Sequence, residues 1–216
     1  MYIKHPTICR QDGVMSYPAR IRSQLAVMIR EKAYKVYDEP VALSSGKTSK
    51  FYFDIKSLAL SRDGRDLFRR VFEVMIYSGN YCVAGMEFGA VPLVMIAGEV
   101  LVKDVLVIRK GDRDHGTMQK IEGLGNVDME GDRIIRVAII DDVVTTGKSI
   151  LKACKAVTDA GLLVHQIFCV VNRMGGDDDP DVLELKEGLR AYDRQDYVCK
   201  LESLFTLGTF GLTTDV

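Results

Sequence analysis

The chain has 216 residues, of which 47% are hydrophobic and 27% are charged, and its formal net charge is −1. This length suits one domain with a full core, or one domain that carries an extra lobe. The near-neutral charge argues against a general nucleic-acid or acidic-lipid binder, whose surface would be basic. The longest apolar region, residues 83–102, is interrupted by Glu87, Pro92 and Glu99, so we expect no membrane partner.

The five cysteines are odd in number and widely spaced, and none forms a CxxC pair. Cys82 and Cys169 lie inside apolar runs, which favours buried free thiols in a reducing cytosol. The first 13 residues lack the apolar core of a secretory signal. We therefore expect a cytoplasmic protein.

In chain order, residues 19–37 place apolar side chains, Val36 among them, at helical spacing. The segment 41–60 has an alternating centre, KFYFDI, that is typical of a strand or ribbon. Residues 63–78 predict another helix, and from residue 81 a strand-then-helix pattern repeats. The remaining predicted strands are 81–85, 105–109, 136–141 and 165–171, and the remaining predicted helices are 90–103, 147–160 and 180–189.

Continuous apolar strands that alternate with amphipathic helices indicate an α/β fold with a parallel sheet covered on both faces. In such sheets, ligands bind at the carboxyl ends of the strands. A polar segment, residues 110–132, contains five glycines and shows no periodicity. It is long for a plain connection in a compact domain, and such segments are usually lids or disordered.

The stretch VAIIDDVVTTGKSI, residues 137–150, leads a buried strand directly into Asp141 and Asp142. At a strand end, two carboxylates can accept hydrogen bonds from sugar hydroxyls or orient a metal-bound water. The chain then turns into a helix, whose first hydroxyl and N–H groups suit a phosphate. The residues that offer these groups are Thr145, Thr146, Gly147 and Ser149. Together they predict a site for a ribose phosphate.

Two other interpretations of this stretch were weighed. The letters GKS end the nucleotide-triphosphate pattern G-x-x-x-x-G-K-[ST], which needs glycine five places before Gly147. That place holds Asp142, whose carboxylate would repel the phosphates, so we reject the pattern. In a purely structural interpretation, Thr146 only caps a helix. The run of buried β-branched residues before the acids makes that interpretation less favoured.

VAIIDDVVTTGKS resembles the phosphoribosyl pyrophosphate (PRPP) signature of type I phosphoribosyltransferases. Four further segments are similar to motifs of orotate phosphoribosyltransferases, in the same order and spacing. They are SSGKTSKFYFDIKSLAL (44–60), GMEFGAVPLV (85–94), VIRKGDRDHGTMQKIEG (107–123) and VVNRMGG (170–176). Because all five motifs occur between residues 41 and 176 in the family's order and spacing, the chain resembles this family.

The resemblance implies a type I phosphoribosyltransferase fold, with a parallel sheet flanked by helices and a small N-terminal hood. We expect residues 1–60 to form an N-terminal helix and the hood segment. Residues 61–200 would be the phosphoribosyltransferase core, with a mobile loop at 110–125. Residues 201–216 would complete the hood or lie against the core.

The activity implied is a Mg²⁺-dependent pentosyl transfer, in which orotate and PRPP give orotidine 5′-monophosphate and pyrophosphate for de novo pyrimidine (UMP) synthesis. The resemblance also implies a homodimer whose mobile loops reach the neighbouring site. Two alternatives remain open: transfer to another base, and a regulator that binds PRPP without turnover. The second usually carries a nucleic-acid-binding module, and the sequence shows neither such a module nor a basic patch.

The resemblance assigns site residues by position. Catalytic roles fall to Arg113, His115, Asp141 and Asp142, with the two acids on the ribose 2′ and 3′ hydroxyls and Mg²⁺ held near them, mainly through PRPP and water. PRPP would be bound by Ser44, Phe88, Gly89, Arg109, Lys110, Arg113, His115, Asp141, Asp142, Val143, Val144, Thr145, Thr146, Gly147, Lys148 and Ser149. Orotate would be bound by Tyr52, Phe53, Lys56, Thr145 and Arg173.

The chemistry of the residues agrees with this assignment. Negative charge builds on the departing pyrophosphate, and loop cations such as Lys110 and Arg113 stabilise it. A closing lid keeps water from the oxocarbenium-like sugar. Alternation predicts that one of Tyr52 and Phe53 faces the core, and Arg173 could also be a plain surface arginine in a polar turn.

The chain departs from the family pattern at several positions. Arg113 stands where lysine is usual, which keeps the charge but is bulkier and adds bidentate reach. Ser44 and Gly89 stand where many members have lysine, and Asn172 where aspartate is common. A second sub-pattern of the family lacks both lysines, and the chain follows it except at residue 55. Lys56 is then expected to carry the charge beside the base.

Overall fold

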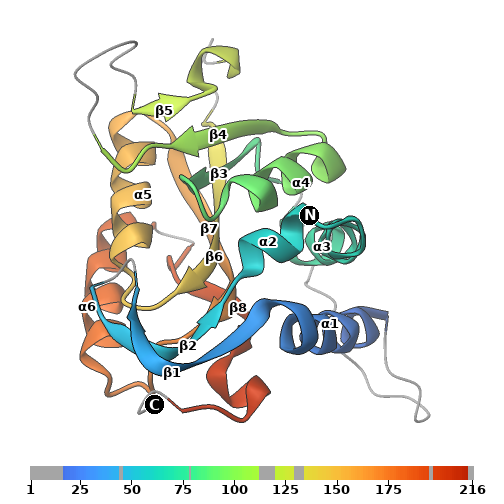
Figure 1. The fold of residues 1–216 in the computed structure, drawn as a ribbon. Coiled ribbons are helices and arrows are strands. Elements are labelled where there is room, and N and C mark those ends of the chain that lie inside the picture. The colour runs from blue at the N-terminus through green and yellow to red at the C-terminus, as the bar shows by residue number, and fades with distance from the viewer. Residues whose placement is uncertain are drawn as a thin grey trace.

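The computed structural model describes residues 17–43, 46–77, 79–111, 120–128, 134–194 and 197–213. These residues form a six-stranded sheet in the order β5-β4-β3-β6-β7-β8 (Figure 1). All neighbouring strands are parallel except β4 and β5, which are antiparallel. The strands are β3 Cys82–Met86, β4 Asp104–Ile108, β5 Ile121–Glu122, β6 Arg136–Val144, β7 Leu163–Asn172 and β8 Leu201–Thr206. The predicted α/β fold with a mostly parallel sheet is confirmed.

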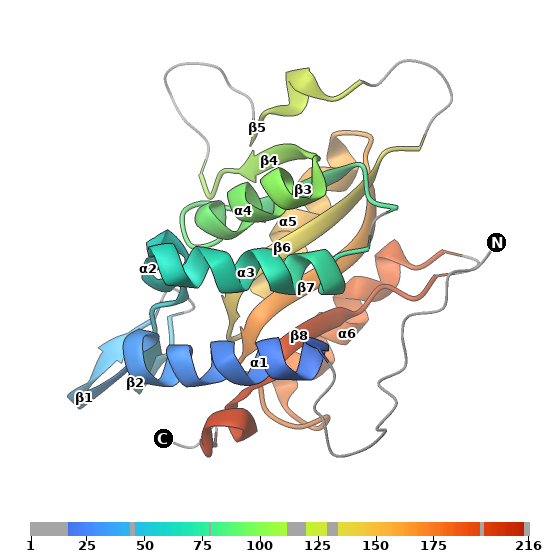
Figure 2. The ribbon, with the colours of Figure 1, turned by 90° about the vertical axis from the view of Figure 1, so that its right-hand side faces the viewer.

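Helices cover both faces of the sheet (Figure 2). On one face lie α1 Tyr17–Met28, α2 Ile55–Leu60, α3 Arg62–Met75 and α4 Val91–Leu101; on the other lie α5 Lys148–Asp159 and α6 Pro180–Leu189. The central strand β6 supplies both cores, because Ala138 and Ile140 point to the first group of helices and Val137 and Ile139 to the second. Burial on both faces is the reason why this strand is continuously apolar.

A separate antiparallel hairpin, β1 Tyr34–Ala42 and β2 Thr48–Phe53, lies across the end of the sheet to which the arrow of β6 points (Figure 1). Strand β2 alternates strictly, so that Ser49, Phe51 and Phe53 are buried while their neighbours are exposed. The Phe53 ring lies 5.3 Å from the Tyr34 ring and 5.0 Å from the Phe210 ring, between centroids. This aromatic cluster fixes the hairpin over the carboxyl ends of the strands.

One prediction for the N-terminal part was wrong. The helix expected over residues 19–37 ends earlier, in a short π-helical turn, Ile29–Ala33, and residues 34–37 belong to β1. Val36, assigned to an apolar helix face, is 69% exposed, as are most of the side chains of β1. The strand or ribbon expected at KFYFDI (50–55) is present as β2 up to residue 53, and the Asp54 side chain then accepts a hydrogen bond from the Ser57 N–H and starts helix α2.

The helices and strands predicted from residue 63 onward are present with small shifts at their ends. The sequence analysis had not identified β8, which pairs with β7 at the edge of the sheet. It leads into a 3₁₀ turn, Leu207–Phe210, that contacts the hairpin through Phe210. The C-terminal residues therefore join the sheet and also support the hairpin. Every helix in the described part of the chain is too short or too polar to span a bilayer.

Val102, at the end of α4, generates a stability prediction. It is a β-branched residue at φ 52°, the left-handed region where glycine or asparagine is preferred, and its side chain is 88% exposed. Val102→Gly should therefore raise the free energy of unfolding by about 1 kcal/mol, measured by urea denaturation. The matched control is Val36→Gly on exposed β1, where φ is ordinary and glycine should lower stability. A destabilised Val102→Gly variant would contradict this account.

Candidate active site

The acid pair lies where β6 ends, between β3 and β7. Asp141 and Asp142 are both partly buried at the end of the apolar run. Within the pair, the Asp142 N–H donates to Asp141 Oδ1 at 2.9 Å, and the Val143 N–H donates to Asp142 Oδ1 at 2.9 Å. These short local hydrogen bonds fix both carboxyl groups at the carboxyl end of the sheet.

The electrostatics of the acid pair are unfavourable in the free protein. Burial, and then the neighbouring Asp142 charge, raise the pKa of Asp141 well above its usual range. Burial also raises the pKa of Asp142, while the Lys110 charge lowers the pKa of both acids. A ligand that brings hydroxyl donors or a cation to these oxygens would stabilise their charged forms.

The turn after the acid pair forms a phosphate-sized cavity. Gly147 has φ 75°, and a Cβ there would lie 2.9 Å from the Leu185 side chain on α6, so only glycine fits. The turn leads into the N-terminus of α5, which favours an anion. The cavity of about 220 Å³ is lined by Asp141, Val143, Val144, Thr145, Thr146, Gly147, Lys148, Ser149, Ile150 and Lys152. All the predicted phosphate-turn residues therefore come together.

The turn between β3 and α4 approaches the acid pair closely. A Cβ on Gly89 would lie 2.7 Å from Asp142 Oδ2, so a side chain at this position would displace the carboxylate. The peptide bond between Glu87 and Phe88 is cis. Many members of the family have lysine at position 89, but here only glycine leaves room for the turn to contact Asp142 directly.

The described basic residues after β4 have different surroundings. The Lys110 N–H donates to Glu87 Oε1 at 3.0 Å, and its charge acts on the acid pair. The Arg109 guanidinium forms an ion pair with Glu122, so it does not extend freely toward the acids. Ser44, Arg113 and His115, also predicted as site residues, lie outside the described residues.

A small cavity of about 60 Å³ joins the hairpin to the acid pair, and Arg173 lines it. Arg173 is buried, which excludes the plain surface arginine. The other lining residues are Leu43, Tyr52, Phe53, Asp142, Val143 and Thr145. This arrangement supplies a charged donor, an aromatic ring and hydroxyl groups beside the acids.

Tyr52 and Phe53 divide as alternation predicts. The Phe53 ring is buried against Tyr34 and Phe210 in the core, whereas Tyr52 is partly exposed, and burial followed by the Asp142 charge raises its pKa. Lys56 does not line the cavity; its Nζ lies 5.5 Å from the centroid of the Phe88 ring.

Sequence reasoning missed four residues that line or support these cavities: Leu43, Ser49, Ile150 and Lys152. Lys152 lies one helical turn after Lys148 on α5, and that spacing is a usable signal. Ser49 is buried on the same face of β2 as Phe51, and its hydroxyl accepts a hydrogen bond from Arg173 Nη2 at 2.9 Å. A polar residue on a buried strand face was the available signal.

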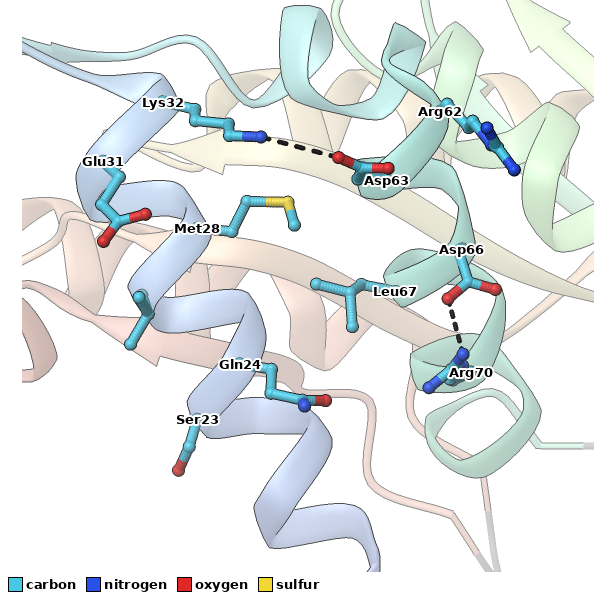
Figure 3. Close-up of a pocket in the computed structure, with 11 residues that line it drawn as sticks. Ser23, Gln24, Met28, Glu31, Lys32, Arg62, Asp63, Asp66, Leu67 and Arg70 are labelled. Carbon is cyan, nitrogen blue, oxygen red and sulfur yellow. Dashed lines mark ion pairs between the residues drawn. The ribbon is translucent and has the colours of Figure 1, made fainter.

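A larger groove of about 780 Å³ lies between α1 and α3 (Figure 3). Met28 and Leu67 form part of its apolar lining. Four of its charged side chains form two ion pairs: Lys32 Nζ lies 3.7 Å from Asp63 Oδ2, and Arg70 Nη2 lies 2.7 Å from Asp66 Oδ2. Because these charges neutralise one another away from the carboxyl ends of the strands, the groove is the weaker candidate.

Among the described residues, no group of three or more His, Cys, Asp and Glu side chains is placed to hold a metal ion. A metal at the acid pair would therefore need further ligands from a substrate or from water.

The fold and the site together define a type I phosphoribosyltransferase, and solved structures agree. One from Mycobacterium tuberculosis, an orotate phosphoribosyltransferase in complex with Fe(III) dicitrate, is 28% identical with a TM-score of 0.63, over 89% of this chain and 99% of that chain. One from Aeropyrum pernix, also an orotate phosphoribosyltransferase, has a TM-score of 0.63 at 24% identity, over 86% of this chain and 94% of that chain, which supports the fold.

Curated relatives specify the family. The orotate phosphoribosyltransferase of Aquifex aeolicus is 37% identical over 179 residues, which cover 79% of this chain and 92% of the relative. That of Methanocaldococcus jannaschii is 35% identical over 155 residues, 72% of this chain and 84% of the relative. No protein-family model matches the chain. On these relatives, the chain belongs to the orotate phosphoribosyltransferase family.

The raised pKa of Asp141 generates a prediction about stability. The folded-state pKa of Asp141 lies above its unfolded value, so ionising this acid lowers the free energy of unfolding. This loss of stability is absent below the ordinary aspartate pKa of about 3.9, grows as pH rises from there, and is complete above the folded-state pKa. Asp141→Asn should therefore stabilise the free protein by about 1 to 3 kcal/mol at pH 7 and have little effect at pH 3.

Urea denaturation at both pH values measures this effect, with Asp104→Asn as the control, because Asp104 is exposed at the start of β4. Equal effects of Asp141→Asn at pH 3 and pH 7 would show that the acid is not under electrostatic strain.

Proposed function

We propose that the protein transfers the phosphoribosyl group of PRPP to orotate, producing orotidine 5′-monophosphate and pyrophosphate in de novo UMP synthesis. The observation that carries the proposal is the acid pair at the end of β6 followed directly by the phosphate-sized turn at α5. Relatives named orotate phosphoribosyltransferase support it. The M. tuberculosis enzyme was solved in complex with PRPP, and that structure is 26% identical with a TM-score of 0.61.

In this proposal, Asp141 and Asp142 accept hydrogen bonds from the ribose 2′ and 3′ hydroxyls. These donors relieve the repulsion that raises the pKa of Asp141. The 5′-phosphate occupies the turn at residues 145–149, where N–H groups, hydroxyls and the N-terminus of α5 converge. Lys148 and Lys152 add positive charge beside it.

The pyrophosphate would lie toward the Phe88–Gly89 turn and Lys110. Lys110 already acts on the acid pair, so its charge lies on the correct side of the site. Arg113 and His115 would add donors that stabilise the departing charge. Arg109 would bind the pyrophosphate only if its guanidinium left the ion pair with Glu122.

The acid pair fits Mg²⁺, because that ion is usually bound by one or two carboxylates together with substrate phosphates and water. Asp141 and Asp142 would hold it, mainly through PRPP and water. When bound, the ion supplies positive charge to the pyrophosphate that leaves.

The base would enter the cavity between Arg173, Tyr52 and Thr145. Orotate carries a carboxylate and carbonyl oxygens, and the Arg173 guanidinium provides charged donors for them. Tyr52 offers an aromatic face on the exposed side of β2, whereas Phe53 would contribute through its backbone, since its ring is in the core. Lys56 would lie further out, near Phe88.

We also propose that the enzyme is a cytoplasmic homodimer, with the β1–β2 hairpin and the C-terminal turn as the hood over the core. Residues 112–119 of the loop expected at 110–125 lie outside the described residues. Three cysteines, at positions 154, 169 and 199, are free and buried, which agrees with a reducing compartment. Analytical ultracentrifugation tests the dimer.

The test of the function is the loss of orotate absorbance in the presence of PRPP and Mg²⁺. Asp142→Asn should lower kcat/KM by about 100-fold or more, because it removes a charge at the reacting sugar. Arg113→Lys should keep kcat within about tenfold, since the cation is retained. Asp104→Asn is the matched control and should be unaffected.

The alternatives predict different results. Consumption of uracil or a purine without consumption of orotate would show a transferase for another base. Tight PRPP binding without turnover of any base would show a regulator and would contradict the proposal.

The contact between Gly89 and Asp142 gives a further prediction. Gly89→Ala should lower kcat/KM by about tenfold or more, because its Cβ would displace the Asp142 carboxylate. The matched control is Gly176→Ala, since a Cβ at Gly176 meets no atom within 4 Å. Wild-type kinetics in Gly89→Ala would show that the position of Asp142 does not depend on this close approach.

A further inference from the structure

The Arg173 guanidinium is held by one short stretch of β2. Arg173 Nη2 donates to Ser49 Oγ at 2.9 Å, and Nη1 donates to the Phe51 carbonyl oxygen at 3.5 Å. The guanidinium carbon lies 4.3 Å from the centroid of the Phe51 ring. At the other end of the residue, the Arg173 N–H donates to the Val144 carbonyl oxygen at 2.8 Å, which fixes its backbone to β6.

One nitrogen of this guanidinium has no hydrogen-bond partner. Arg173 is only 9% exposed, yet its Nε donates to no acceptor among the described residues, while its side chain lines the cavity shared with Tyr52 and Asp142. Buried charged donors are normally satisfied. A buried guanidinium that lines a cavity and has a nitrogen without an acceptor is able to donate to a ligand.

Ser49 is the side chain that makes this arrangement possible. It is 4% exposed, and its hydroxyl oxygen also accepts the Phe51 N–H at 3.2 Å, so one oxygen joins the strand backbone to the guanidinium. Its neighbours Thr48 and Lys50 point outward. Removing the hydroxyl would leave Nη2 without its partner and let the guanidinium rotate away from the cavity.

We propose that Ser49 is a positioning residue for the base: it orients Arg173 so that the guanidinium, with its free Nε, binds the carboxylate or carbonyl oxygens of the acceptor pyrimidine. This inference rests on the proposed function. Ser49 is absent from the lining of the phosphate-turn cavity, so its effect is confined to the base and leaves PRPP binding intact.

The test separates the orotate KM from PRPP affinity. Ser49→Ala should raise the KM for orotate about tenfold or more, as expected for a lost hydrogen bond to a charged group, and leave kcat within about threefold. The dissociation constant for PRPP, measured by calorimetry with Mg²⁺, should stay within about twofold of the wild-type value. Lys50→Ala, on the exposed face of β2, is the control and should match the wild type.

A second pair of variants keeps the test decisive if Ser49→Ala folds poorly. Ser49→Thr and Ser49→Val add nearly the same volume, but only threonine keeps the hydroxyl. The orotate KM should be at least about fivefold lower in Ser49→Thr than in Ser49→Val. Equal KM values in this pair, or a PRPP dissociation constant that rises in parallel with the orotate KM, would overturn the inference.

Failure of the inference is distinct from failure of the proposed function. Orotate turnover by the wild type with an unchanged KM in Ser49→Ala overturns only the role of Ser49. Absence of wild-type turnover overturns the function and this inference together.

Discussion

Two neighbouring carboxyl groups at the end of a buried strand are the constraint on which the rest of the site depends. Asp141 and Asp142 lie near the end of β6, where burial disfavours the charged form of both and the Asp142 charge further raises the pKa of Asp141. A protein tolerates such a pair when a ligand satisfies it, and the stability lost in the free state is the usual cost of an active site. The surrounding groups suit such a ligand. Gly89 lets the turn between β3 and α4 approach Asp142 closely, and the turn before α5 is suited to bind an anion.

In the proposed function, the hairpin extends the site from the sugar phosphate to the base. Its aromatic cluster, Tyr34, Phe53 and Phe210, anchors it to the C-terminal turn, and an ion pair between Lys47 and Asp181 connects its tip to α6. Through Ser49 and Phe51 the hairpin also holds Arg173, which comes from the strand beside the acid pair. The cavity proposed for the base is therefore made by two parts of the chain that each depend on the other, so changes in the hairpin should affect base binding more than PRPP binding.

Local patterns allowed much of this to be predicted from the sequence. The alternation of strands and helices, the acid pair and the phosphate turn are each encoded within a few neighbouring residues, and the structure places them as expected. The errors fall where contacts between residues far apart in the sequence determine the structure. Residues 34–37 follow a helical pattern but form a strand because β2 pairs with them. The hydrogen bond between Ser49 and Arg173 joins residues 124 positions apart. The ion pair of Arg109 with Glu122 and the close approach of Gly89 to Asp142 also depend on how the strands and turns come together.

A crystal structure of the protein with PRPP and Mg²⁺ is the most direct test of the central claim. The account predicts that the ribose 2′ and 3′ hydroxyls lie within hydrogen-bond distance of Asp141 and Asp142, with the 5′-phosphate in the turn before α5. A ribose bound elsewhere, for example in the groove between α1 and α3, or acids that contact only protein atoms in the complex, would contradict it.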